Sequence, residues 1–412
     1  MSKAVVASAA LQAPAQGGAR PGVDAGDDVH RPRSPSAPAA GHQSLALWRR
    51  AAIGMPVLVW VLLLLAALAC AMVLAITWGS ASIRVGTVWS ILAYELAQSL
   101  GVADTSSSAA VWSSQQHQIV WMIRMPRVLL AALVGAGLAV VGVVMQAMVR
   151  NPLADPYMLG VSSGASVGAV SVLAYGSFAA AGVYAITAGS FVGALLATAL
   201  VYALAHQRGR IQSTRLILSG VAVGYMLMGM TSLITLTAGQ RELAGALLTW
   251  TLGSLAGTQW RALAVPAVIL LLGMAWLCLQ ARDLNALLVG EEAAVTLGVN
   301  TQRLRFQLFV VVSLVTGTMV AVSGAIGFVG LVIPHVTRMW VGSDHRRVLP
   351  VSAVLGALFL VLVDLLARTW FAPMELPVGV ITSLIGGPFF IWMLWRNAAA
   401  SSQTGASLGG AP

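Results

Sequence analysis

Long apolar segments recur along almost the whole of this chain, and they constrain its fold more than any other feature. Each is close to the roughly 20 residues that an α-helix needs to cross the hydrocarbon core of a bilayer. Only 9% of the 412 residues are charged and 58% are hydrophobic, whereas a soluble domain carries roughly 25% charged residues. The sequence therefore predicts an all-α integral membrane protein.

Ten segments meet or nearly meet this length, so we expect about ten transmembrane helices. They are residues 53–78, 128–148, 157–176, 181–205, 216–238, 262–280, 307–323, 325–342, 349–366 and 377–395. The first is too long for the core of a signal peptide and counts as a spanning helix. The boundary between the seventh and eighth is weak, because only Ser323–Gly330 separates them.

The ends of the chain differ in composition from its middle. Residues 1–46 are mostly Ala, Pro, Gly and Ser with scattered charges, which predicts a disordered cytoplasmic tail. Residues 47–397 form the ten-helix membrane domain. Residues 398–412 are rich in Ser, Gly and Ala and predict a flexible C-terminal tail.

The net charge of +10 comes almost wholly from arginine, because Lys3 is the only lysine. The arginines are scattered between apolar segments, which argues against nucleic-acid binding. With both termini in the cytoplasm, thirteen arginines outside the tail lie on the inner side and six on the outer. The positive-inside rule therefore favours this orientation.

Three of the outer arginines lie in unusual places. Arg124 and Arg127 flank Pro126 at the expected start of the second span, where a cation opposes the helix dipole by roughly 0.3–1 kcal/mol. They therefore suggest a positive outer patch for an acidic partner, although such side chains can also reach lipid headgroups. Asp364 and Arg368 are four residues apart on the ninth span and are expected to pair.

Glycines mark the third span and its neighbours. Gly160, Gly164 and Gly168 recur every four residues, and Gly220 and Gly224 repeat the spacing in the fifth span. Such spacing brings membrane helices into close backbone contact. Packing alone is sufficient to explain these glycines, and the alternative is that they line a path that opens and closes.

The longest inner connection, residues 282–305, contains the sequence LLVGEEAAVTLGVN. It predicts a short amphipathic helix between Gly290 and Gly298, with Glu291 in its first turn, where the dipole favours acids. A cytoplasmic helix that does not cross the membrane is a natural surface for a soluble partner.

The residues do not support ATP hydrolysis, metal binding or transport driven by an ion gradient. The phosphate-binding loop of ATPases needs a lysine, and Lys3 is followed by Ala-Val. Neither Cys70 nor Cys278 nor the six histidines has metal-ligand spacing. A carrier driven by an ion gradient usually has several carboxylates within the membrane, and Asp364 is the one candidate. We therefore expect no cofactor and no metal, and a separate subunit as the source of energy.

Four long motifs, in order, resemble the FecCD-type permeases over about residues 50 to 397. They begin at IRMPRVLL, LLVGEEAAVTLGV, GAIGFVGLVIPH and ELPVGVITSLIGGP. Proteins of this family are the membrane subunits of type II ATP-binding cassette (ABC) importers for iron-siderophores, haem and vitamin B12. The resemblance implies a ten-helix importer permease in the bacterial inner membrane.

The resemblance also implies partners. These are two ATPase subunits on the cytoplasmic side, a periplasmic binding protein, and a second copy of the chain or a homologous permease, within membrane lipid. In family members that import vitamin B12, arginines matching Arg124, Arg127 and Arg368 meet acids of the binding protein. The ATPase-coupling segment of the family matches Gly290, Glu291, Ala294, Leu297 and Gly298. The fifth helix of the family borders the substrate path.

The resulting hypothesis is a non-enzymatic permease that imports a ferric chelate, with iron-siderophore ahead of haem and vitamin B12. Three alternatives are a secondary transporter that works without an ATPase, an intramembrane enzyme, and an exporter or lipid-handling permease. The missing catalytic constellations argue against the enzyme, and the outer arginines argue against the exporter.

Overall fold

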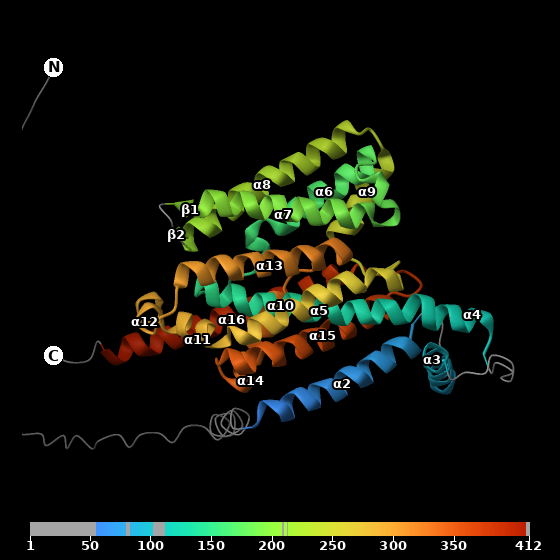
Figure 1. The fold of residues 1–412 in the computed structure, drawn as a ribbon, viewed down its shortest axis with the longest axis horizontal. Helices are drawn as coiled ribbons and strands as arrows, with labels where there is room; N and C mark the ends of the chain where they lie inside the picture. The colour runs from blue at the N-terminus through green and yellow to red at the C-terminus, as the bar shows by residue number, and fades with distance from the viewer. Residues whose placement is uncertain (1–54, 80–82, 102–111, 208–209, 212, 409–412) are drawn as a thin grey trace, which may run out of the picture. The chain divides into compact units, whose positions relative to one another are not determined.

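The computed structural model describes residues 55–79, 83–101, 112–207, 210–211 and 213–408. The expected N-terminal tail, residues 1–46, lies outside this part. The described residues form helices and one small antiparallel pair of strands (Figure 1). The α-helices are α2 (Val57–Thr77), α3 (Val85–Ser99), α4 (Ser114–His117), α5 (Met125–Val149), α6 (Val161–Tyr175), α7 (Ala185–Ala205), α8 (Ser213–Thr237), α9 (Arg241–Thr251), α10 (Ala264–Leu279), α11 (Ala281–Val289), α12 (Glu291–Thr296), α13 (Thr301–Ser323), α14 (Val329–Val341), α15 (His345–Thr369) and α16 (Val378–Leu408).

Short elements join some of these helices. They are the π-helix η1 (Gln118–Arg124), the 3₁₀-helices η2 (Pro156–Leu159), η3 (Ala179–Tyr184) and η4 (Trp260–Ala262), and the strands β1 (His206–Gln207) and β2 (Arg210–Ile211).

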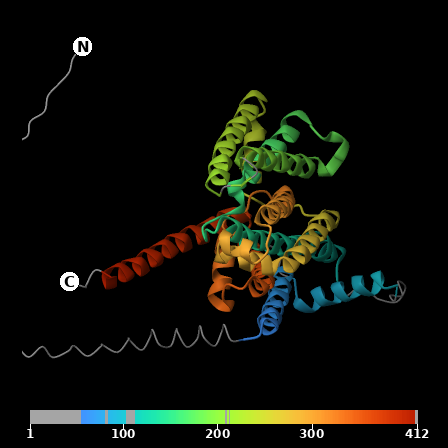
Figure 2. The ribbon, with the colours of Figure 1, turned by 60° about the vertical axis from the view of Figure 1, so that its left-hand side comes forward.

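Helix α5 is at the centre of the packing. Almost all of its residues are buried, and it contacts α10, α13, α14 and α15. Helices α6, α7 and α8 pack on one another as a second group, and α13 contacts both α5 and the pair α6 and α7. Figures 1 and 2 both show α13 between these two groups. Helix α2 packs on α15 and leaves most of its own surface uncovered, as expected for a helix that faces lipid.

All ten predicted spans are helical, but two of them are shorter than expected. Eight described helical segments have the length and apolar character to cross a membrane. The two shorter apolar helices are α6, with 15 residues, and α14, with 13. At about 1.5 Å per residue they reach about 20–23 Å, less than the roughly 30 Å of a bilayer core.

Backbone breaks cause this shortening. Gly160 ends η2 with a φ of 71°, and Gly324 and Phe328 take φ values of 68° and 67° before α14. The Tyr157 hydroxyl donates a hydrogen bond to the Ile326 carbonyl and accepts one from the Ile326 amide, both at 2.9 Å. The two irregular segments therefore satisfy each other, as non-helical backbone at membrane depth must.

The second span begins earlier than the sequence indicated. Ser113 caps α4 in a reciprocal capping box with Gln116, and α4, η1 and α5 form one continuous helical segment, Ser114–Val149. Arg124 and Arg127 therefore lie within the segment, and our expectation that they oppose a helix N-terminal dipole was wrong. A proline inside a helix removes one backbone hydrogen bond. The wider turn of the π-helix η1 ends at Arg124, two residues before Pro126.

Other differences concern the connections. Helices α3, α9 and α11, each 9 to 15 residues long, were not predicted from the sequence. The expected flexible tail from residue 398 is helical as far as Leu408, because α16 continues into it. That stretch begins with Ala398–Ala400, and alanine has the highest helix propensity.

Candidate functional site

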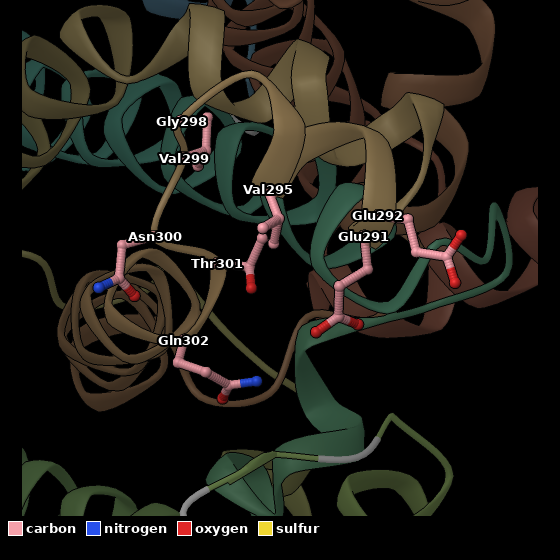
Figure 3. A pocket seen from close by; sticks show the side chains of 8 residues that line it. All are labelled: Glu291, Glu292, Val295, Gly298, Val299, Asn300, Thr301 and Gln302. Carbon is pink, nitrogen blue, oxygen red and sulfur yellow. The ribbon is translucent and has the colours of Figure 1, made fainter.

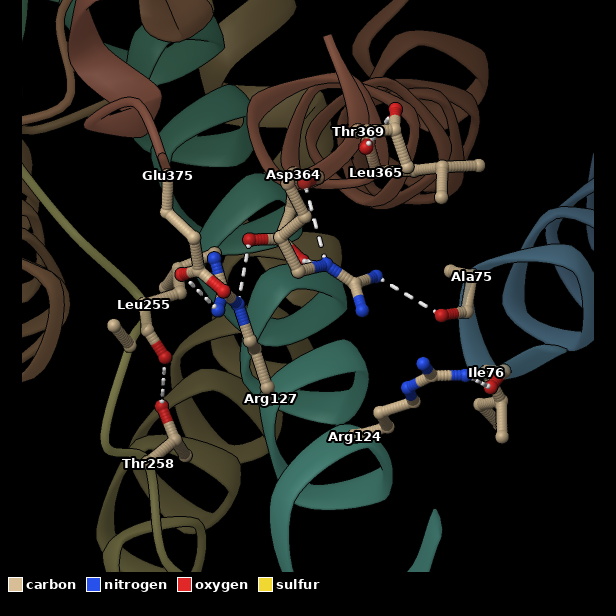
Figure 4. A network of polar contacts seen from close by, with 12 residues as sticks. Ala75, Ile76, Arg124, Arg127, Leu255, Thr258, Asp364, Leu365, Thr369 and Glu375 are labelled. Atoms are coloured by element: carbon tan, nitrogen blue, oxygen red, sulfur yellow. Dashed lines mark hydrogen bonds and ion pairs between the residues drawn. The ribbon is translucent and has the colours of Figure 1, made fainter. Parts of the chain in front are cut away.

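Three arginines and two carboxylates meet where α5, α15 and the loop before α16 come together (Figure 4). Arg127 Nε lies 2.9 Å from Asp364 Oδ1, and Arg127 Nη1 lies 2.8 Å from Glu375 Oε2. Arg368 Nε lies 3.1 Å from the other oxygen of Asp364, which confirms the expected pair on α15. Asp364 is thus held between two guanidinium groups, and this offsets the cost of burying it.

The C-terminal end of α2 completes this arginine cluster. Arg124 Nη1 donates to the carbonyls of Ile76 and Thr77 at 2.6 and 2.9 Å, and Arg368 Nη2 donates to the Ala75 carbonyl at 3.0 Å. The last carbonyls of a helix lack helical partners and carry negative partial charge, so cations stabilise them. Two of the three arginines therefore anchor α2 to the rest of the protein.

The cluster is not the open positive patch that the sequence suggested. Arg124, Arg127 and Arg368 are only 4%, 5% and 5% exposed. Their side chains nevertheless line a pocket of about 260 Å³, together with Glu375 and Gly79. Guanidinium groups outnumber carboxylates there, so the pocket has a net positive lining that a short acidic group can enter.

A second surface lies on α12 and the start of α13. Glu291, Val295 and their neighbours, drawn in Figure 3, line a hollow of about 840 Å³. The predicted short helix is present as α12, and Gly290 and Gly298 flank it as expected. Ala294 of α12 is fully buried, whereas Leu297 at the end of the helix is 69% exposed. The outer face of α12 is therefore partly apolar and open.

Local hydrogen bonds fix the orientation of α12. Gly298 has a φ of 83°; its amide donates to Val295, and the Val299 amide donates to Ala294, which together form a Schellman cap. Glu291 pairs with Arg305 on α13 at 3.2 Å. The helix is thus held at both ends.

Asn285 links α11 to the turn between α14 and α15. Its amide nitrogen donates to Asp344 at 2.7 Å, and its oxygen accepts from the His345 amide at 2.9 Å. Burial opposes ionisation of Asp344, but hydrogen bonds from Asn285 and the Arg346 amide and the nearby arginines outweigh it and lower its pKa. The α12 surface is therefore tied to one end of α15, while Asp364 and Arg368 lie near the other end.

Three of the five predicted glycines are close-packing positions, and Gly160 and Gly224 are not. A Cβ atom at Gly164 would overlap the carbonyl of Gly193, one at Gly168 the carbonyl of Gly189, and one at Gly220 the carbonyl of Met158. Gly224 is less crowded, since its added Cβ would lie 3.7 Å from Ser163 Oγ. Gly160 is outside the predicted stripe and serves as the left-handed residue between η2 and α6.

Sequence reasoning missed Gln146, Arg338, Asn285 and the role of Glu375. Gln146 is buried in α5; it donates to the Gly330 and Leu331 carbonyls at 3.3 and 3.4 Å and accepts from Arg338. A lone amide within an apolar run is a usable signal, because it needs a partner inside the membrane. Asn285 and Glu375 lie in connections and carry no comparable signal.

The sequence matches the FecCD transport family over residues 62–396. The chain belongs to this family. It is 44% identical over 311 residues to the cobalamin import system permease protein BtuC of Halobacterium salinarum, covering 75% of this chain and 80% of that protein. It is 41% identical to the hemin transport system permease protein HmuU of Yersinia pestis, covering 71% and 86% of the two chains.

The fold agrees with this family. A solved structure described as a metal-chelate type ABC transporter in an inward-facing conformation matches with a TM-score of 0.68 and 29% identity, covering 83% of this chain and all of that one. The protein is therefore a multi-pass permease of the ABC importer kind, located in the cell membrane.

Proposed function

We propose that this permease imports a ferric chelate from the periplasm to the cytoplasm, powered by two ATPase subunits and supplied by a periplasmic binding protein. The observation that carries the proposal is the placement of two different surfaces at opposite ends of α15. His345, which is bonded to Asn285, lies 23 positions before Arg368 on this helix. At 1.5 Å per residue the two are about 35 Å apart. That distance matches the thickness of a membrane.

We assign the arginine cluster to docking of the binding protein. The pocket lined by Arg124, Arg127 and Arg368 has a net positive lining and opens beside Glu375, which is 45% exposed. An acidic side chain of the partner can enter this pocket and replace Glu375 as an ion-pair partner of Arg127. Charge-assisted hydrogen bonds of this kind are short and directional.

We assign the α12 surface to the ATPase subunits. Gly290 and Gly298 set the ends of the helix, Glu291 and Ala294 hold it on the body, and Leu297 projects from it. An exposed apolar side chain beside two acidic residues over a large hollow suits a soluble protein partner.

Helices α6, α7 and α8 border the proposed substrate path. Gly164 and Gly168 let α6 lie directly against α7, and Gly220 brings α8 onto η2. Helix α8 leaves Tyr225, Met226 and Met228 exposed. Methionine side chains adapt to different surfaces, so we place the path between this face and a second copy of the chain or a homologous permease.

Reconstitution in liposomes tests the function. The chain with its ATPase and binding protein should take up a radiolabelled ferric siderophore only when ATP is enclosed, and uptake should stop when the ATPase is omitted. Parallel assays with haem and cobalamin identify the cargo. Uptake by the chain alone would instead favour the secondary transporter and would refute the proposed mechanism.

A docking variant tests the outer surface separately. The Arg124→Gln variant removes one of the three positive groups that line the pocket, and it should weaken binding-protein affinity by about tenfold. Arg84→Gln is the matched control, because Arg84 is exposed and lies outside the pocket. Equal binding by both variants and the unmodified chain would contradict the docking role.

A further inference from the structure

We infer that this permease holds an anionic phospholipid in a crevice between α7, α10 and α13, with the lipid phosphate at Arg261. The proposal does not depend on the identity of the transported chelate. The crevice has two adjoining compartments, one apolar and one polar, which share Tyr184, Thr187, Ala262 and Val322.

The apolar compartment fits an acyl chain. Its volume is about 290 Å³, and Phe191, Val265, Ile269 and Ala321 supply much of its wall. This volume lies just below the roughly 300–1,000 Å³ found for ligand pockets, so it accommodates part of one chain rather than a whole lipid. The helices that form it all cross the membrane.

The polar compartment fits a phosphate group. It measures about 150 Å³ and is lined by Gln259 and Thr258, next to the Arg261 side chain at the edge of the apolar compartment. Within the described residues, the side chains of Tyr184, Thr187, Gln259 and Arg261 make no hydrogen bond or ion pair. Three uncharged donors that lack protein partners, on Tyr184, Thr187 and Gln259, thus line the crevice together with one cationic guanidinium.

The position of the crevice matches the depth of lipid headgroups. Trp260, beside Arg261, donates from its indole nitrogen to the Trp121 carbonyl at 2.8 Å, and the two rings lie 4.6 Å apart. Trp121 lies one turn before Arg124, so the crevice is at the same end of the protein as the arginine cluster. Tryptophan is enriched at the membrane–water interface. The guanidinium therefore lies where phosphates lie and the apolar walls where acyl chains lie.

Native mass spectrometry of the detergent-purified chain with added dioleoyl phosphatidylglycerol tests this site. The unmodified chain should retain one lipid, and Arg261→Gln should weaken retention at least tenfold. The Ala188→Phe variant fills the apolar compartment and should have a similar effect. Arg84→Gln, an exposed arginine outside the crevice, should bind like the unmodified chain. Unchanged unfolding temperatures show that the variants are folded.

Two further probes separate the contribution of the headgroup charge from that of the acyl chain. Dioleoyl phosphatidylcholine should bind more weakly than phosphatidylglycerol, because its headgroup has no net charge, and inorganic phosphate should not displace the bound lipid. Retention in both crevice variants, or an equal loss in Arg84→Gln, would overturn the proposal. Equal binding of phosphatidylcholine would overturn the selection for anionic lipid, and displacement by inorganic phosphate would overturn the acyl-chain site.

Discussion

Arg127 makes two ion pairs, and it shows how a residue of the proposed docking surface can also be structural. It holds Asp364 of α15 and Glu375 of the loop before α16 at once. Asp364 is fully buried, so its charge depends on these partners for compensation. Any substitution at Arg127 therefore affects folding as well as docking.

Replacing Arg127 with glutamine should destabilise the protein strongly. Breaking a buried ion pair by removing one partner costs about 3–5 kcal/mol, because the remaining charge stays buried. The free energy of unfolding in mixed detergent micelles measures this cost. Arg84→Gln should change it by less than about 0.5 kcal/mol, as is usual at exposed sites. A loss below about 1 kcal/mol at Arg127 would show that the pair contributes little.

Asp155 gives the protein a pH-dependent stability. Burial raises its pKa to about 6, and the hydrogen bond from the Tyr157 amide only partly opposes this. Between the ordinary value of 3.8 and about 6 the folded chain binds more protons than the unfolded chain. Stability at this site is therefore greatest below about pH 4 and falls as the pH rises towards 6.

The Asp155→Asn variant should lose this dependence. Asparagine keeps an oxygen that can accept from Tyr157 and removes the charge. Above pH 6 the variant should be more stable than the unmodified chain by about 1–3 kcal/mol, and the difference should vanish below about pH 4. Thermal unfolding of the isolated chain from pH 4 to 8 tests this. A difference that is constant over that range would exclude the raised pKa as its cause.

At the scale of elements, the contact between α6 and α7 depends on missing side chains. Gly164 and Gly168 of α6 meet Gly193 and Gly189 of α7 through their carbonyl groups. Membrane helices gain little from apolar burial against one another, because lipid is equally apolar, so close backbone contact becomes the main attraction.

Adding one methyl group at Gly168 should separate these helices. The Gly168→Ala variant places a Cβ against backbone, which cannot move aside as a side chain can, and we expect a loss of about 1–3 kcal/mol. The matched control is Gly224→Ala on α8, where the nearest atom is 3.7 Å away. Because alanine favours helix by up to about 1 kcal/mol over glycine, this control should be neutral or stabilising. Unfolding measurements that rank the two variants in the opposite order would contradict the packing geometry.

At the scale of the whole molecule, α15 joins the two proposed docking surfaces. Its first residue, His345, bonds to Asn285 of α11, and Asp364 and Arg368 near its end hold α5 and α2. The coupling that we propose between an ATPase and a binding protein therefore has one continuous helix, α15, between the α12 surface and the arginine cluster.

The Leu297→Glu variant should uncouple the ATPase without unfolding the permease. Leu297 is largely exposed on α12, so a charge there leaves the core intact. We expect ATPase co-purification and ATP-dependent uptake to fall at least tenfold, with an unfolding temperature close to that of the unmodified chain. Retention of the ATPase by this variant would remove α12 from the proposed interface.

Local information in the sequence was sufficient for part of this structure. Hydropathy located the spans, because a bilayer requires about 20 apolar residues whatever their neighbours are. The spacing of four between Asp364 and Arg368 predicted their ion pair, and the glycines around α12 predicted its limits. Each of these features depends on residues within one continuous segment of the chain.

The tertiary structure decided which distant groups meet. Arg127 pairs with a residue 237 positions away, and Tyr157 bonds to Ile326, 169 positions away. The same contacts turned an expected open patch into a buried cluster and shortened two of the ten spans. The sequence shows where a buried charge or a break in a helix requires a partner. Only the packing of helices far apart in the chain determines which partner is within reach.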